Sequence, residues 1–183
     1  MKIVRNIFNV SGLLLSGSTA LSSVLKFSRS MSFKDKVVVI TGGSRGLGLV
    51  MARQLASRGA KLALLARDRE EMETAAEELS KKTEIDFFVC DVRSEERVNE
   101  AIAKVLERFG TIDVLINNAG VIEVGPFDTM SISDFRNSMD NHFFASLYTI
   151  FAVLPTMKEK KFGRIVNISS IGGKISVPHL LPY

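Results

Sequence analysis

Short apolar runs and longer amphipathic segments alternate along the chain from Lys36 onward. Most of the short runs consist of valine, leucine and isoleucine in succession, which is typical of a strand buried on both faces. The predicted strands are residues 37–40, 62–65, 85–90, 114–116 and 164–168. Between them, helical spacing of apolar residues predicts helices at 47–55, 69–81, 94–109 and 132–157, the last stopping near Pro155.

This alternation predicts the fold class. Strands separated by helices form βαβ units, whose crossovers require a parallel sheet with helices on its faces. We therefore expect an α/β protein with a Rossmann-like, doubly wound parallel sheet in three α/β/α layers, over residues 35–183. The chain has 183 residues with 46% hydrophobic and 24% charged residues, which leaves room for one such domain and a tail.

The tail, residues 1–34, differs from the domain in composition. It carries five basic residues and no acidic one, so 19 basic and 20 acidic residues remain in 35–183. The domain is thus close to neutral and shows no charge pattern of nucleic-acid binding. Residues 6–25 are uncharged but serine-rich, which leaves two interpretations open. They are a targeting segment or weak membrane anchor, mitochondrial in a eukaryote, or a leader without structural role. For the domain we expect a cytoplasmic location.

Cys90 is the one cysteine of the chain. A single cysteine excludes an internal disulfide and a multi-cysteine metal site, and we expect no metal. Because Cys90 follows the apolar run Phe87-Phe88-Val89, we interpret it as a buried structural thiol.

A glycine-rich turn lies between the first strand and the first helix, with Gly42, Gly46 and Gly48 in the spacing Gly-x-x-x-Gly-x-Gly. Glycines at such a turn let the backbone approach a pyrophosphate, and the following helix offers free N–H groups to the phosphates. No Gly-Lys-Ser/Thr follows, which argues against a P-loop nucleotidase. The turn therefore predicts a dinucleotide site.

Four motifs in this order resemble the short-chain dehydrogenase/reductase family, and together they span residues 36–183. The first is the Thr-Gly-x-x-x-Gly-x-Gly turn at 41–48. The others are Cys90-Asp91-Val92, Asn117-Asn118-Ala119-Gly120, and a Ser…Tyr pair in which Tyr183 follows Ser170 by thirteen residues. The resemblance implies an NAD(P)-binding domain of an oxidoreductase that acts on alcohol or carbonyl groups.

The resemblance also implies which residues hold the nucleotide. They come from the glycine turn, from the adenine-contacting segment after the third strand, and from the segment after the fourth strand. These residues are Gly42, Ser44, Arg45, Gly46, Leu47, Gly48, Asp91, Val92, Asn118, Ala119 and Gly120.

Charge near the end of the second strand indicates which nucleotide is bound. NAD-binding proteins of this fold carry an acid there for the ribose 2′-hydroxyl. The corresponding position in this chain holds Ala66, followed by Arg67, while Arg45 lies in the glycine turn. Two guanidinium groups would pair with a 2′-phosphate. We therefore expect NADP, with NAD as the alternative if Asp68 takes the ribose instead.

For the chemistry, the resemblance implies that Tyr183 exchanges a proton with the substrate while hydride moves to or from the nicotinamide. Ser170 would hold the carbonyl oxygen; Ser169 competes for this role, but the thirteen-residue spacing favours Ser170. A phenol with a pKa of about 10 is a poor base at neutral pH and needs a nearby cation. In the family this cation is a lysine four residues after the tyrosine, and the chain ends at Tyr183.

The family also has an asparagine in the helix before the fifth strand, which holds a water in a proton relay. Counting back from Leu154-Pro155 places this position at His142, with Asn141 directly before it. Adjacent helical residues point about 100° apart, so the two cannot serve the same site. His142 would suit a relay because imidazole titrates near neutral pH. A packed or capping histidine is the alternative.

Measured against the family, the chain would lack the lysine-bearing helix, the last two strands and the substrate loop. We therefore expect a fragment of a longer product, with an exposed sheet edge at the fifth strand. The intact protein is expected to be an NADP-dependent reductase or dehydrogenase of small carbonyl or alcohol substrates and to form a homo-oligomer. The alternative is a catalytically silent nucleotide-binding fragment.

Overall fold

The computed structural model describes residues 31–175 and 177–183. The chain divides into two units, Met1–Ser32 and Phe33–Tyr183, and the helices and strands described belong to the second. The uncharged stretch 6–25, on which the membrane and targeting predictions depend, lies outside the described residues. Among the described helices, none has both the length and the apolar character needed to span a bilayer.

Five parallel strands form one sheet in the order β3-β2-β1-β4-β5. They are β1 (Val37–Thr41), β2 (Lys61–Ala66), β3 (Ile85–Val89), β4 (Val114–Asn117) and β5 (Arg164–Asn167). Every residue of β1 and β4 is buried, as the apolar runs predicted. Within the described part of the chain, β5 is an edge strand and all its residues are exposed. The predicted fold class is confirmed.

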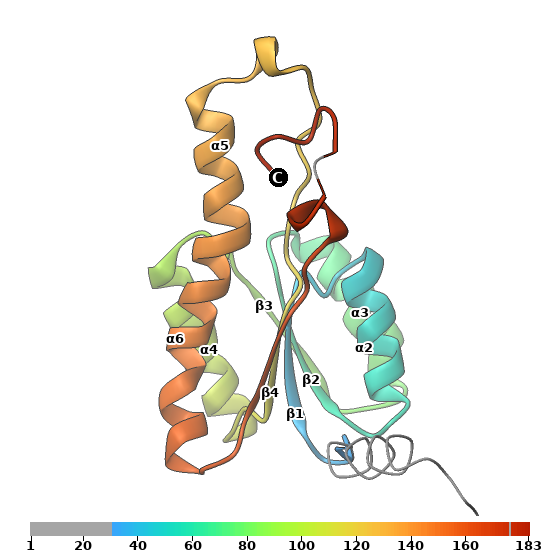
Figure 1. Ribbon diagram of the computed structural model, residues 1–183. Helices are drawn as coiled ribbons and strands as arrows, with labels where there is room; N and C mark the ends of the chain where they lie inside the picture. The colour runs from blue at the N-terminus through green and yellow to red at the C-terminus, as the bar shows by residue number, and fades with distance from the viewer. Residues whose placement is uncertain (1–30, 176) are drawn as a thin grey trace, which may run out of the picture. The chain divides into compact units, whose positions relative to one another are not determined.

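Helices pack on both faces of this sheet (Figure 1). One face is covered by α2 (Gly46–Ala56) and α3 (Arg69–Ser80), the other by α4 (Glu95–Phe109) and α6 (Ala145–Glu159). The apolar side of α4 and one side of α6 enclose a core against the sheet. Its helical members are Val98, Ala101, Ile102, Val105, Ala145, Val153 and Met157. These residues give the three-layer arrangement its buried centre.

The predicted helix at 132–157 consists of three segments. A helix α5 (Ile132–Met139) passes into a π-helical turn, Asp140–Phe144, and then into α6. The expected stop near Pro155 is wrong, because this proline lies inside α6, which continues to Glu159. Proline removes one backbone donor from the helix, but the buried residues on either side of it, Val153 and Met157, hold this part of α6 against the core.

The sheet order creates a switch point between β1 and β4. The chain adds β2 and β3 on one side of β1, and β4 and β5 on the other. In such sheets the crevice at the carboxyl ends of the two central strands is where ligands bind. Thr41 and Asn117 end these strands, and the C-terminal segment lies over the same end of the sheet, beside α5 (Figure 1).

Candidate functional site

The glycine turn has a backbone that only glycine adopts without strain at two of its positions. Gly42 and Gly46 have φ of +64° and +52°. At Gly48 a Cβ would lie 2.0 Å from the carbonyl oxygen of Gly42, so this glycine allows α2 to fold tightly onto the turn. Gly46 has nothing within 4 Å of a would-be Cβ. The space beside Gly48 is therefore filled by the turn itself, whereas the space beside Gly46 is open.

The N-terminus of α2 begins at Gly46, on this open side. No side chain caps it, because the preceding residue is Arg45, whose side chain makes no capping hydrogen bond. Uncapped N–H groups and the positive end of the helix dipole favour an anion. This end of α2 can hold a phosphate group.

Thr41 ties the turn to the segment after β4. Its Oγ1 accepts hydrogen bonds from the backbone N–H groups of Asn118 and Ala119, both at 3.0 Å. In return, the Asn118 amide donates to the carbonyl oxygens of Thr41 (3.1 Å) and Gly42 (3.2 Å). Thr41 was not among the predicted site residues, although it opens the glycine motif. It holds the two strand ends at the switch point together.

A cavity of about 560 Å³ opens over these strand ends. This volume lies within the usual range of small-molecule sites. It brings together the predicted nucleotide residues with one exception, Gly48, which is packed beneath the turn. The predicted residues in its wall are Gly42, Ser44, Arg45, Gly46, Leu47, Arg67, Asp91, Val92, Asn118, Ala119 and Gly120. Glu71 and Asn141 also line it and were not predicted as nucleotide residues.

Four charged residues gather at the end of this cavity that lies beyond β2. Arg45 donates to Glu71 from Nη1 at 3.0 Å, and Ser44 Oγ donates to the other carboxylate oxygen of Glu71 at 2.9 Å. Asp68 caps α3, with Oδ1 accepting from the backbone N–H of Glu71 at 3.0 Å. Arg67 lines the same end and is exposed. Asp68 is thus already committed to the start of α3.

The segment after β3 forms another part of the wall. Both carboxylate oxygens of Asp91 accept hydrogen bonds from the Arg93 side chain, at 2.6 to 3.1 Å, and this guanidinium holds the Asp91 pKa below its usual range. Cys90 is 2% exposed, and burial raises its pKa to about 11. The predicted burial of the Cys90 thiol is confirmed.

A second cavity of about 320 Å³ lies on the other side of the β4 end. Its wall includes all three predicted catalytic residues, Ser170, Tyr183 and His142. The Tyr183 ring meets the His142 ring edge-on, with centroids 5.0 Å apart. A Cβ at Gly172 would lie 3.1 Å from Tyr183 Cε1 and 3.5 Å from Ser170 Oγ, so the serine and the tyrosine flank the same glycine. Ala119 lines both cavities.

The two candidates for the relay position, Asn141 and His142, both lie in the π-helical turn. His142 faces the second cavity, and its Nε2 hydrogen-bonds the carbonyl oxygen of Val121 at 2.8 Å. Asn141 faces the first cavity, and its Nδ2 donates to the Asn137 carbonyl oxygen at 2.7 Å. The two side chains therefore line different cavities, as expected from the angle of about 100° between adjacent helical residues.

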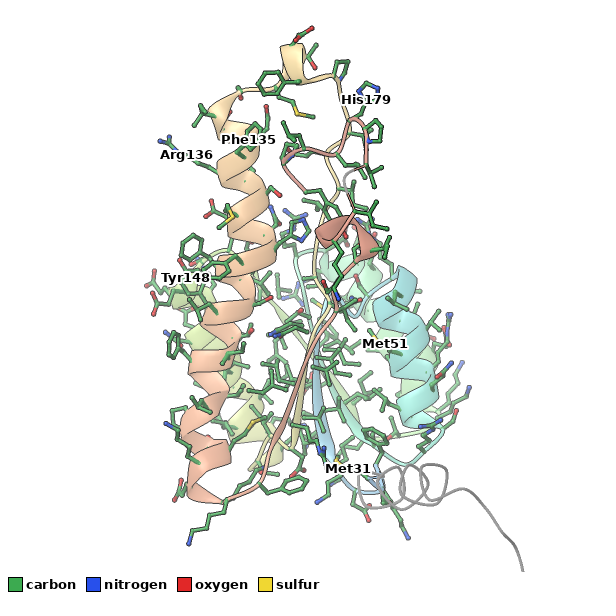
Figure 2. The ribbon with its side chains drawn as sticks, in the orientation of Figure 1. Met31, Met51, Phe135, Arg136, Tyr148 and His179 are labelled. Atoms are coloured by element: carbon green, nitrogen blue, oxygen red, sulfur yellow. The ribbon has the colours of Figure 1, made fainter. Side chains whose placement is uncertain are left out.

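The C-terminal segment and the β4–α5 connection form the outer end of this region. The N–H of Gly125 donates to the carbonyl oxygen of His179 at 3.0 Å, and Figure 2 shows His179 at this end, away from the sheet. Ser138 of α5 donates to the Pro182 carbonyl oxygen, directly before Tyr183. These contacts place the tyrosine from two directions. In the described part of the chain, no group of three metal-ligand side chains occurs.

Comparison with known proteins gives matches over the same residues. A family model described as short chain dehydrogenase matches residues 36–183. The "Dehydrogenase/reductase SDR family member 7B" of Danio rerio is 38% identical over 183 residues, covering 94% of this chain and 59% of that protein. An uncharacterized oxidoreductase of Staphylococcus saprophyticus is 35% identical over 145 residues, covering 78% and 62%. The chain thus spans about three fifths of the length of these relatives.

Solved structures agree in fold. A xylitol dehydrogenase with bound NAD⁺ superposes with a TM-score of 0.80 at 34% identity, covering 84% of this chain and 60% of that one. A metagenomic short-chain oxidoreductase in complex with NADP superposes with a TM-score of 0.78 at 35% identity, covering 84% and 70%. Both carry a nicotinamide nucleotide.

Proposed function

This chain belongs to the short-chain dehydrogenase family, and on that basis we propose that the whole protein is an oxidoreductase that transfers hydride between NADP(H) and a carbonyl or alcohol group. One observation carries the proposal: the cavity of the predicted nucleotide residues and the cavity of Ser170 and Tyr183 share Ala119. A dinucleotide in the first cavity would thereby reach the second.

The residues of the first cavity fit a dinucleotide. Its pyrophosphate would lie at Gly46, where no atom fills the space of a side chain and the N-terminus of α2 is uncapped. Asp91 and Val92 would line the adenine. Arg67 and Arg45 would pair with a 2′-phosphate, and Ala66 supplies no acid for a 2′-hydroxyl. These charges support NADP over NAD.

In the second cavity, each polar residue has a distinct proposed role. Bound NADP(H) would supply or accept the hydride. Tyr183 would donate a proton to the carbonyl oxygen, or take it back from the alcohol in the reverse direction. Ser170 would donate a hydrogen bond to the same oxygen as charge develops on it. His142, in contact with the Tyr183 ring, would relay protons.

Titration of the protein with NADPH and NADH tests the nucleotide preference. We expect NADPH to bind more tightly than NADH. Arg67→Ala should reduce the binding free energy of NADPH by about 1.5–3 kcal/mol, the value of a hydrogen bond to a charged group. Arg58→Ala is the matched control, because Arg58 is exposed and does not line the cavity. Equal affinities of the unaltered protein for the two nucleotides would refute the NADP proposal.

Turnover of the whole protein tests the chemistry. Oxidation of NADPH is followed with a panel of ketones, aldehydes and quinones. Tyr183→Phe should abolish turnover and leave NADPH affinity unchanged, whereas Tyr148→Phe, in α6 but not in the wall of the second cavity, should leave both turnover and NADPH affinity unchanged. Ser170→Ala should lower kcat by at least tenfold, and Ser169→Ala should not. Binding of NADPH without turnover of any substrate would favour the alternative, a catalytically silent nucleotide-binding protein.

The outer face of α6 supports a further part of the proposal, that the intact protein forms a homo-oligomer. Phe151 of α6 is 61% exposed, and Phe144, the last residue of the π-helical turn before it, is 37% exposed. Contiguous exposed apolar surface of this kind is typical of a protein–protein interface. Light scattering should give a mass of at least two copies, and Phe151→Ser should reduce it. A monomer at micromolar concentration would contradict this.

A further inference from the structure

Glu71 is a negative charge inside the cavity proposed for the nucleotide. It stands in the first turn of α3, and both oxygens of its carboxylate are held by the glycine turn. One oxygen accepts from the Arg45 guanidinium at 3.0 Å, the other from Ser44 Oγ at 2.9 Å. The Glu71 side chain is one-third exposed and lines the same end of the cavity as Arg67.

The two partners of Glu71 differ in freedom. The Arg45 side chain is 76% exposed, so its guanidinium can turn toward a ligand at little cost. Ser44 is 7% exposed and sits within the glycine turn, so its hydroxyl stays where it is. The carboxylate of Glu71 is therefore anchored by Ser44, and Arg45 is the partner that can leave it.

The other acids at this end have partners of their own. Asp68 accepts the N–H of Glu71 as the cap of α3, and Asp91 is held by Arg93. Glu71 is thus the carboxylate that a ligand pairing with Arg45 must compete with. A 2′-phosphate would do so, whereas a 2′-hydroxyl has no charge with which to draw Arg45 away.

From this arrangement we propose that Glu71 is a specificity-determining residue that limits the preference for the 2′-phosphorylated nucleotide. Because its carboxylate pairs with Arg45, Glu71 lowers the affinity for NADPH and leaves the affinity for NADH unchanged. The ratio of the two affinities is therefore smaller than Arg45 and Arg67 alone would give. This inference rests on the proposed binding of a nicotinamide nucleotide in the first cavity.

The test removes the negative charge of Glu71 and keeps the size and shape of its side chain. Glu71→Gln retains an acceptor for Ser44 and the backbone N–H that Asp68 caps. An exposed ion pair contributes up to about 1 kcal/mol, so its removal should raise NADPH affinity by about threefold to fivefold and leave NADH within twofold. The same rise is expected for adenosine 2′,5′-bisphosphate relative to AMP. Glu70→Gln, which removes the neighbouring exposed charge outside the cavity, should change neither ratio.

A double-mutant cycle isolates the route through Arg45. In an Arg45→Ala background, Glu71→Gln should no longer raise the NADPH-to-NADH affinity ratio. An unchanged or lower ratio in Glu71→Gln, an equal rise in Glu70→Gln, or a rise that survives Arg45→Ala would each overturn the inference. Tighter binding of NADH than of NADPH by the unaltered protein would instead refute the NADP preference. The change in the NADPH-to-NADH affinity ratio in Glu71→Gln would still decide the role of Glu71. Binding of neither nucleotide would refute both.

Discussion

Substitution of Gly46 separates the loss of a ligand contact from the cost of backbone strain. Gly46 and Gly110 both have positive φ, +52° and +73°, and neither has an atom within 4 Å of a would-be Cβ. An L-residue in this region costs roughly 1–2 kcal/mol at either position. For a domain of this size, each kcal/mol lowers Tm by about 2–4 °C. Gly46→Ala and Gly110→Ala should therefore lose similar stability.

Nucleotide binding should distinguish the two variants. Gly46 lines the cavity at the start of α2, whereas Gly110 follows the C-terminus of α4 and does not line it. A methyl group at Gly46 would occupy space that the pyrophosphate needs and should weaken NADPH binding by about tenfold or more, or at least about 1.4 kcal/mol. Gly46→Val should weaken it further, and Gly110→Val should not.

Fluorescence titration with NADPH measures the affinities, and thermal unfolding followed by circular dichroism confirms that each variant is folded. The comparison is made between the alanine variants at a temperature well below both midpoints. Equal NADPH affinity in folded Gly46→Ala and Gly110→Ala would mean that the open side of the turn does not hold the pyrophosphate.

Three further predictions concern the packing and stability of the domain. Thr41→Val leaves two backbone N–H groups at the end of β4 without their acceptor and should cost about 1–3 kcal/mol for each in denaturant unfolding, whereas Thr41→Ser should cost little. Burial acts to raise the pKa of Asp113, but hydrogen bonds from Lys160 and the Val37 N–H outweigh it and hold this pKa below its usual range. The free energy of unfolding should therefore fall as the pH drops below about 4, and fall less steeply in Asp113→Asn. With a pKa of about 11 and 2% exposure, Cys90 should not react with a thiol reagent at mildly alkaline pH until the protein is unfolded; prompt labelling of the native protein would contradict its burial.

The sheet could be predicted from the sequence because its strands have a strong signal. Runs such as Val37 to Ile40 are buried on both faces of the sheet. An uninterrupted apolar run of this kind is typical of a central strand in a parallel sheet. That the predicted nucleotide residues line one cavity could be predicted for the same reason, since the residues that follow each parallel strand meet at one edge of the sheet. Gly48 shows the limit of this reasoning, because its glycine character serves packing against Gly42 and not the cavity wall.

Contacts between distant side chains could not be predicted in this way. Glu71 is one of several glutamates in α3, and nothing in its surroundings in the sequence distinguishes it from Glu70. Its place in the cavity depends on how α3 packs beside the glycine turn. Likewise, the stop expected at Pro155 failed because a proline signal is local, whereas the packing of Val153 and Met157 in the core holds α6 together past it.

The π-helical turn at Asp140–Phe144 limits which insertions and deletions this segment can accept. Asn141 lines one cavity and His142 the other, and the extra residue of the wider turn sets the direction in which both stand relative to α6, where Ala145 and Thr149 are buried. Deleting a single residue there would make the helix more regular but turn α5 by about 100° against α6. Both side chains would then leave their cavities together. In this segment the number of residues is therefore as constrained as their identity, and insertions or deletions that a surface loop would accept should inactivate the protein.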